Sequence, residues 1–182
     1  MKMNMPNCLT ILRVLMVPVF VVFMLVTIWG HADKYVAGIL FILASLTDTL
    51  DGYLARKNNQ ITVFGKFMDP LADKLLVCAA MICLVDLEQL PSWIVIIIVS
   101  REFIISGFRL VAAERGTVIA ASWWGKLKTV SQMIMVILLV FNFDGPVFDT
   151  LEIVFVYLAL VLTVISLVDY IAKNIGVLRD VH

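Results

Sequence analysis

The sequence predicts an all-α integral membrane protein, a six-transmembrane-helix bundle in a single domain over residues 1–182 with N-in, C-in topology. The composition is 62% hydrophobic and only 15% charged, and the mean hydropathy of +1.03 lies far above that of a soluble domain. Six segments each supply about 20 mostly apolar residues, enough to cross the hydrocarbon core. Lysine and arginine gather on one side of these segments, which fixes the orientation.

The first apolar segment is longer than the core of a signal peptide, and no cleavage site of small residues follows it, so it is expected to be a retained span. The second, third and fourth segments carry charges at one end, so their helices are expected to extend beyond the bilayer. Short connections predict antiparallel neighbours. The six segments lie near residues 10–29, 36–55, 67–87, 93–113, 130–143 (extended on its N-terminal side) and 151–172.

The distribution of positive charge places both termini in the cytoplasm. With this orientation the outer connections, near residues 30–35, 86–92 and 142–150, contain Lys34 and no other lysine or arginine. The chain has 14 basic and 14 acidic residues, so its net charge gives no reason to expect a nucleic-acid partner.

Four aspartates, Asp48, Asp51, Asp69 and Asp73, lie where the second segment leads into the third, at the predicted cytoplasmic face. On a helix the first pair is separated by about 60° and the second by about 40°, so each pair shares one face. A short turn through residues 57–64 would bring the two pairs together. Converging carboxylates suit Mg²⁺ or Mn²⁺, and four of them suit two ions.

Small residues accompany the aspartates. Gly52 and Ala55 follow Asp48 and Asp51 by one turn each, and Gly65 precedes Asp69 by one turn. They leave room for a ligand near the backbone, and Arg56 beside them suits a metal-bound phosphate. Aspartates that face water at helix ends would explain any one of these acids, but explain all four at these spacings poorly.

The run Asp48-x-x-Asp51-Gly52-x-x-Ala55-Arg56, then eight residues, then Gly65-x-x-x-Asp69-x-x-x-Asp73, resembles the motif of the CDP-alcohol phosphotransferases at every position. Those enzymes have about six spans, are often homodimers, and transfer a phosphatidyl or phospho-alcohol group from a CDP-linked donor to an alcohol, releasing CMP. The resemblance implies that the four aspartates bind two divalent metals and that Asp73 is also the general base. It assigns contacts with the CDP donor to Asp48, Gly52, Ala55, Arg56, Gly65 and Asp69.

Cations in the fourth and fifth segments indicate which kind of alcohol is the acceptor. Arg101 lies inside an apolar run, and Arg109 follows eight residues later, about 80° around the helix. An arginine at this depth needs an anion. One alternative is an internal partner, Glu102 or an aspartate of the metal site; the other is a phosphate on the acceptor, bound by Arg101, Arg109 and Lys126. A cationic pocket favours glycerol 3-phosphate or inositol phosphate over serine, choline or ethanolamine.

The segments "NCLTILR", "SREFIISGFR" and "GKLKT" are also similar to those of the bacterial phosphatidylglycerophosphate synthases. That resemblance implies CDP-diacylglycerol and sn-glycerol 3-phosphate as substrates, phosphatidylglycerophosphate as product, and a bacterial cytoplasmic (inner) membrane location with the active site facing the cytoplasm. Three polar residues of the first segment are spaced by three and are expected to border the cavity that holds the substrates: Asn7, Thr10 and Arg13. An N-terminal cap with a snorkelling arginine is the alternative for these three.

Two other functions fit parts of the pattern. One is the same family with another acceptor, such as inositol phosphate or serine. The other is an ion transporter, because acids within a membrane also mark ion paths. The acids cluster at one face, however, and no polar residues continue toward the outer side, which disfavours a transporter.

Overall fold

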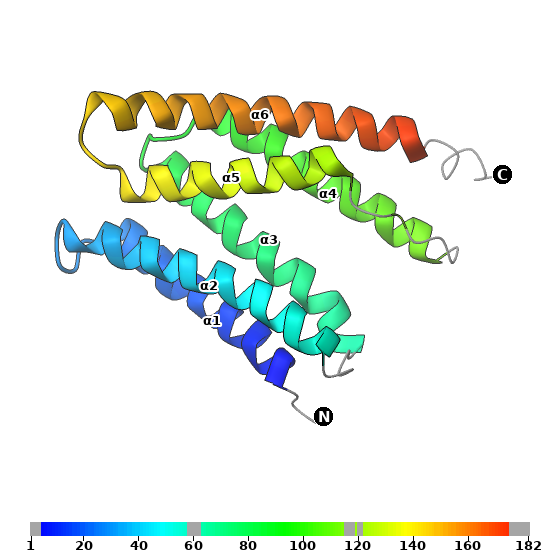
Figure 1. Cartoon of the computed structure of the whole chain (residues 1–182). Helices are drawn as coiled ribbons and strands as arrows, with labels where there is room; N and C mark the ends of the chain where they lie inside the picture. The colour runs from blue at the N-terminus through cyan, green and yellow to red at the C-terminus, as the bar shows by residue number, and fades with distance from the viewer. Residues whose placement is uncertain (1–4, 58–62, 115–118, 120–121, 175–182) are drawn as a thin grey trace. The chain divides into compact units, whose positions relative to one another are not determined.

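All regular secondary structure in the part of the chain that the structure describes is helical. A computed structural model describes residues 5–57, 63–114, 119 and 122–174, without the side chains of 5–7, 48–57, 63–70, 73 and 114. Within these ranges there are six helices and no strand, one helix at each predicted segment (Figure 1). The helices are α1 (Met5–Leu25), α2 (Ala32–Lys57), α3 (Val63–Asp86), α4 (Ser92–Glu114), α5 (Trp123–Phe141) and α6 (Pro146–Asn174).

Three of the helices have a stretch long and apolar enough to cross a membrane when only the described residues are considered: Cys8–Leu25 of α1, all of α5, and α6. The apolar stretch of α6 is only 22% buried within the protein, and that of α1 also 22%. Apolar surface left exposed to this extent is expected to contact lipid. Charges such as Arg101, Glu102 and Arg109 interrupt α4, so the six-span topology stays a prediction.

The chain divides into two compact units. Unit 1 comprises Met1–Gln89 with Leu139–Asn142, and unit 2 comprises Leu90–Leu138 with Phe143–His182. In unit 1, α1 packs against both α2 and α3 (Figure 1). The rings of Phe20 and Phe41 meet in its core, with their centroids 6.0 Å apart. In unit 2, α4 packs against α6, where Phe108 meets Tyr170 edge-on at 6.2 Å. The single domain over residues 1–182 stays a prediction.

The first helix ends earlier than predicted, at Leu25 rather than near Trp29. The carboxylate of Asp33 accepts hydrogen bonds from the backbone N–H groups of Ile28, at 2.8 Å, and Trp29, at 3.0 Å. Gly30 follows with φ of 71°, a conformation that glycine adopts without steric cost. The apolar run therefore continues past the helix, and its last residues form the turn into α2.

The third and fifth helices end in left-handed residues. Glu88 has φ of 60°, and the N–H of Gln89 donates to the carbonyl of Leu84 at 2.9 Å, which closes α3 with a Schellman-type bond. Asn142, with φ of 42°, ends α5. The predicted fifth segment therefore stops at Phe141, two residues short of its expected end.

Candidate functional site

The four aspartates of the motif lie on two helices of unit 1, as predicted. Asp48 and Asp51 belong to the last turns of α2, and Asp69 and Asp73 to the first half of α3. The connecting residues 58–62 lie outside the described residues, and α2 ends beside the start of α3 (Figure 1). The helical spacing is thereby confirmed, and each pair shares one face. The side chains of Asp48, Asp51, Gly52, Ala55, Arg56, Gly65, Asp69 and Asp73 are not described.

No other metal site competes with this motif among the described side chains, where no three histidine, cysteine, aspartate or glutamate residues cluster. The convergence of the four carboxylates stays a prediction. The donor set itself fits a hard divalent cation, because it consists of carboxylate oxygens on adjacent ends of two packed helices.

A buried arginine joins α1 to α2 one turn before Asp48. Arg13 is fully buried, and its Nε donates to the carbonyl oxygen of Ala44 at 3.2 Å. The same oxygen accepts a bond from Thr47 Oγ1 at 2.7 Å. Burying a guanidinium is costly unless it is hydrogen-bonded, so this contact fixes α1 against α2 at one level. Arg13 does not snorkel to the surface.

The antiparallel packing of α1 on α2 then shows where the other two residues of the "NCLTILR" segment, Asn7 and Thr10, lie relative to the aspartates. Since Arg13 faces Ala44, Thr10 lies roughly level with Thr47 of α2, and the backbone of Asn7 roughly level with Leu50, between Asp48 and Asp51. Thr10 is 1% exposed, in agreement with an inward-facing position. The side chain of Asn7 is not described.

The deepest predicted acceptor residue, Arg101, has internal partners in unit 2. Its side chain is 9% exposed; Nη1 donates to Glu102 Oε1 at 2.9 Å and Nε to Ser166 Oγ at 3.1 Å. Gly125 of α5 lies close by, since a Cβ built on it would be 3.4 Å from Arg101 Nη2. Glu102 was one of the internal partners expected for Arg101, and the structure shows that pair.

Lys128 is a cation that the sequence did not single out. Its side chain is 1% exposed, and Nζ binds the same Glu102 Oε1 that Arg101 binds. Lys126, two residues earlier on α5, is exposed. Positions two apart on a helix lie about 200° from each other, so one lysine of "GKLKT" faces inward and the other outward. The available signal was Glu102, an acid in an apolar run that needs a cation from another helix.

Arg109 lies nearer the end of α4 and is exposed, with its Cζ 5.9 Å from the ring centre of Tyr170 on α6. Tyr170 is 3% exposed, and its hydroxyl has no hydrogen-bond partner among the described residues. A guanidinium on an aromatic face is attracted to the ring, which helps to hold Arg109 in place although it is exposed. Arg101, Arg109 and Lys126 thus belong to one unit but differ in burial.

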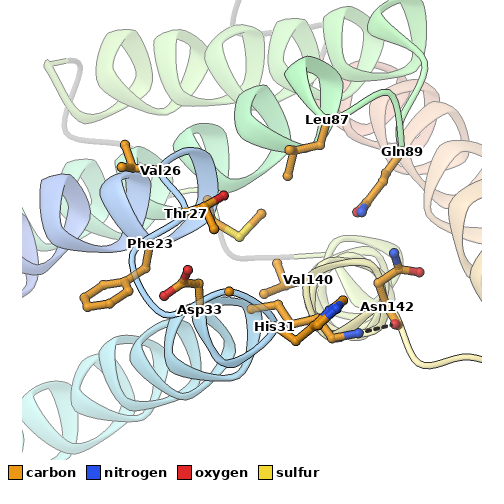
Figure 2. A pocket seen from close by; sticks show the side chains of 12 residues that line it. Phe23, Val26, Thr27, His31, Asp33, Leu87, Gln89, Val140 and Asn142 are labelled. Atoms are coloured by element: carbon orange, nitrogen blue, oxygen red, sulfur yellow. Dashed lines mark hydrogen bonds between the residues drawn. The ribbon is translucent and has the colours of Figure 1, made fainter.

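A cavity of about 180 Å³ lies at the other end of unit 1, where α1 turns into α2. Figure 2 shows His31, Asp33, Gln89 and Asn142 around it. Lys34, which also lines the cavity, donates from Nζ to the carbonyl oxygen of Asn142 at 2.9 Å. The cavity lies at the opposite end of α2 from Asp48 and Asp51. Because of this separation, the cavity is not part of the aspartate site. The one aspartate that lines it, Asp33, already accepts hydrogen bonds from the turn that it caps.

Comparison with known proteins agrees with the motif. The model of the CDP-alcohol phosphatidyltransferase family matches residues 3–165, and the chain belongs to this family. It is 46% identical to the CDP-diacylglycerol–glycerol-3-phosphate 3-phosphatidyltransferase of Bacillus subtilis (strain 168), over 94% of this chain and 95% of that protein. It is 41% identical to the protein of the same name from Haemophilus influenzae, over 99% of this chain and 98% of that one. The Salmonella paratyphi A protein of that name is 39% identical, over 99% of this chain and 100% of its own length.

Proposed function

We propose that this chain transfers the phosphatidyl group of CDP-diacylglycerol to sn-glycerol 3-phosphate, giving phosphatidylglycerophosphate and CMP. The observation that carries the proposal is the complete family motif on adjacent ends of α2 and α3, in a chain that matches relatives of this activity over nearly its full length. The product would feed the synthesis of phosphatidylglycerol and cardiolipin.

The aspartate motif is proposed to hold two Mg²⁺ or Mn²⁺ ions through Asp48, Asp51, Asp69 and Asp73. When bound, the metals would neutralise charge on the diphosphate and on the departing CMP. Gly52, Ala55 and Gly65 are proposed to leave room for the CDP-linked donor near the backbone, and Arg56 to bind its phosphate. Asp48 and Asp69 are proposed to contact the donor as well as a metal.

In the proposed reaction Asp73 takes the proton of the acceptor hydroxyl. The hydroxyl oxygen forms a bond to the phosphatidyl phosphorus while the bond from that phosphorus to the CMP oxygen breaks. An ionised aspartate is a weak base, so much of the rate must come from positioning of the two substrates.

The phosphate of the acceptor is proposed to bind Arg101, Arg109 and Lys126 in unit 2. Arg109 and Lys126 are exposed and carry donors suited to a phosphate, and Arg101 supplies positive charge from the buried side. Thr10, Arg13 and Asn7 are proposed to border the cavity of the active site, since Arg13 binds α2 at Ala44, one turn before Asp48.

The same proposal includes six spans with both termini in the cytoplasm, an active site facing the cytoplasm of a bacterial inner membrane, and a homodimer. The helix connections at residues 26–31, 87–91 and 142–145 contain no lysine or arginine, which supports their placement outside. Labelling of single cysteines introduced at Gly30 and Glu88 in intact cells by a membrane-impermeant reagent tests the topology.

The activity is tested with purified protein, CDP-diacylglycerol and Mg²⁺, supplied separately with glycerol 3-phosphate, inositol phosphate and serine. We expect CMP release with glycerol 3-phosphate and a lipid product carrying two phosphates. Release with serine or inositol phosphate instead would assign another acceptor. Metal or proton flux in sealed vesicles without CMP release would support the transporter.

A further inference from the structure

Unit 2 contains a buried ion cluster, the Glu102 cluster, formed by Arg101 and Glu102 of α4, Lys128 of α5 and Ser166 of α6. Arg101 Nη1 and Lys128 Nζ both bind Glu102 Oε1, and Arg101 Nε donates to Ser166 Oγ. These contacts join α4, α5 and α6: the Glu102 carboxylate links α4 to α5, and the Arg101 guanidinium links α4 to α6.

The packing of α5 on α4 at this level depends on the Glu102 carboxylate, because the two cations that it binds are buried. The side chains of Arg101, Lys128 and Glu102 are 9%, 1% and 19% exposed. Two cations that share one oxygen are held close together, and without the carboxylate they would repel each other with little water to screen them. Loss of the Glu102 charge is thus expected to push α5 away from α4 at this level.

The part of α5 that would move includes Lys126. Gly125 lies against Arg101, where a Cβ would come within 3.4 Å of Nη2, and Lys128 is tied to Glu102. Lys126 lies between these two contacts and faces outward from them. Its backbone position is therefore set by α4, the same helix that carries Arg109.

We infer that Glu102 is a positioning residue for the acceptor phosphate: its carboxylate fixes Arg101 and Lys128, and thereby sets Lys126 of α5 at a defined place relative to Arg109 of α4. The inference rests on the proposed function. In this inference neither Glu102 nor Lys128 contacts substrate. An acceptor with a phosphate is selected because Arg109 of α4 and Lys126 of α5 are held at a fixed distance from each other.

The test compares Glu102→Gln and Glu102→Asp with Asp149→Asn, a charge-removing control at an exposed acid in the first turn of α6. Steady-state kinetics give kcat and separate KM values for the two substrates, and thermal unfolding in detergent checks the fold. We expect Glu102→Gln to raise the KM for glycerol 3-phosphate by about 10- to 100-fold, with the KM for CDP-diacylglycerol unchanged. Glu102→Asp should recover part of this loss, and Asp149→Asn should match wild type.

Two further variants keep the test decisive. Lys128→Met should shift the same KM, and the double variant with Glu102→Gln should lose less than the two single losses combined, because the groups act together. If Glu102→Gln does not fold, Ser166→Ala should raise the KM for glycerol 3-phosphate more modestly, because it removes the partner of Arg101 Nε and a hydrogen bond within α6 to the carbonyl of Thr163 but leaves the Glu102 carboxylate in place. A folded Glu102→Gln with wild-type KM values, or with both KM values raised equally, would overturn the inference. Wild-type protein that uses another alcohol overturns the proposed function instead: with inositol phosphate the comparison applies to the KM of that alcohol, and with serine, which carries no phosphate, the inference is overturned too.

Discussion

A close contact between α2 and the end of α5 in unit 1 leads to a quantitative prediction. Gly38 is buried, and a Cβ built there would lie 2.6 Å from Cζ and 2.7 Å from Cε2 of Phe141. Carbon atoms in contact are ordinarily about 3.5 to 4.0 Å apart, so in Gly38→Ala the Phe141 ring must retreat by about 1 Å. The ring already packs against Tyr35, with centroids 6.1 Å apart, and retreat disturbs that contact.

The size of the effect follows from two opposing terms. Overpacking of this kind costs about 1 to 3 kcal/mol, while replacing a helical glycine by alanine gains up to about 1 kcal/mol. Gly38→Ala is therefore expected to lower the free energy of unfolding by about 1 kcal/mol, or Tm by about 2 to 4 °C for a chain of this size. Gly107 of α4 is also helical and has no atom within 4 Å of a built Cβ, so Gly107→Ala should instead raise Tm by about 2 to 4 °C.

Thermal unfolding of the detergent-solubilised protein measures both variants under the same conditions. Phe141→Leu in the Gly38→Ala background removes the ring atoms that clash, so the double variant should lose less stability than the sum of the two single variants. The packing described for Gly38 is wrong if Gly38→Ala melts as high as Gly107→Ala. Strict additivity with Phe141→Leu would show that the ring is not the cause.

Three predictions concern activity. Asp73→Asn should abolish CMP release while CDP-diacylglycerol binding stays measurable, because the variant loses the proposed base. Arg109→Ala should raise the KM for glycerol 3-phosphate by about tenfold or more and leave the KM for the CDP-lipid nearly unchanged, as loss of a charged phosphate contact predicts; Lys173→Met, which removes an exposed cation of α6, is the matched control. EDTA should stop turnover, and Mg²⁺ or Mn²⁺ should restore it.

Each of these has an outcome that contradicts it. Full turnover by Asp73→Asn excludes that aspartate as the base. Equal changes in both KM values for Arg109→Ala indicate a structural role for the arginine. Undiminished activity in metal-free buffer would exclude the two-metal site.

The positions of all six helices could be predicted from sequence because a run of about 20 apolar residues is a strong signal by itself. The helix ends were less accessible. The helix α1 ends four residues before the apolar run does, where the carboxylate of Asp33 accepts hydrogen bonds from the N–H groups of Ile28 and Trp29. A hydropathy profile contains no information about these bonds. The left-handed Glu88 is likewise set by a local hydrogen-bond pattern that composition does not reveal.

The cations of unit 2 show the same limit at the site. Arg101 could be predicted to need an anion, and Glu102 was one of the partners considered. Lys126 was chosen over Lys128, however, because the sequence alone does not reveal which of two lysines 200° apart on a helix faces inward. Only the packing of α5 makes Lys128 the buried partner of Glu102.

The placement of buried polar groups along each helix bears on the choice between an enzyme and a transporter. Among the described side chains that are buried, the polar and charged ones are Thr10, Arg13, Asp33, Arg101, Lys128, Ser131, Gln132, Thr163 and Ser166. With the exception of Asp33, which caps a turn, each lies at the middle of its helix or in the half that the charge asymmetry assigns to the cytoplasm. A continuous ion path would need fully buried polar side chains toward the outer side too, where Gln89 and Glu152 are only partly buried. Their one-sided placement suits a site that opens to the cytoplasm, where water-soluble glycerol 3-phosphate would enter and CMP would leave.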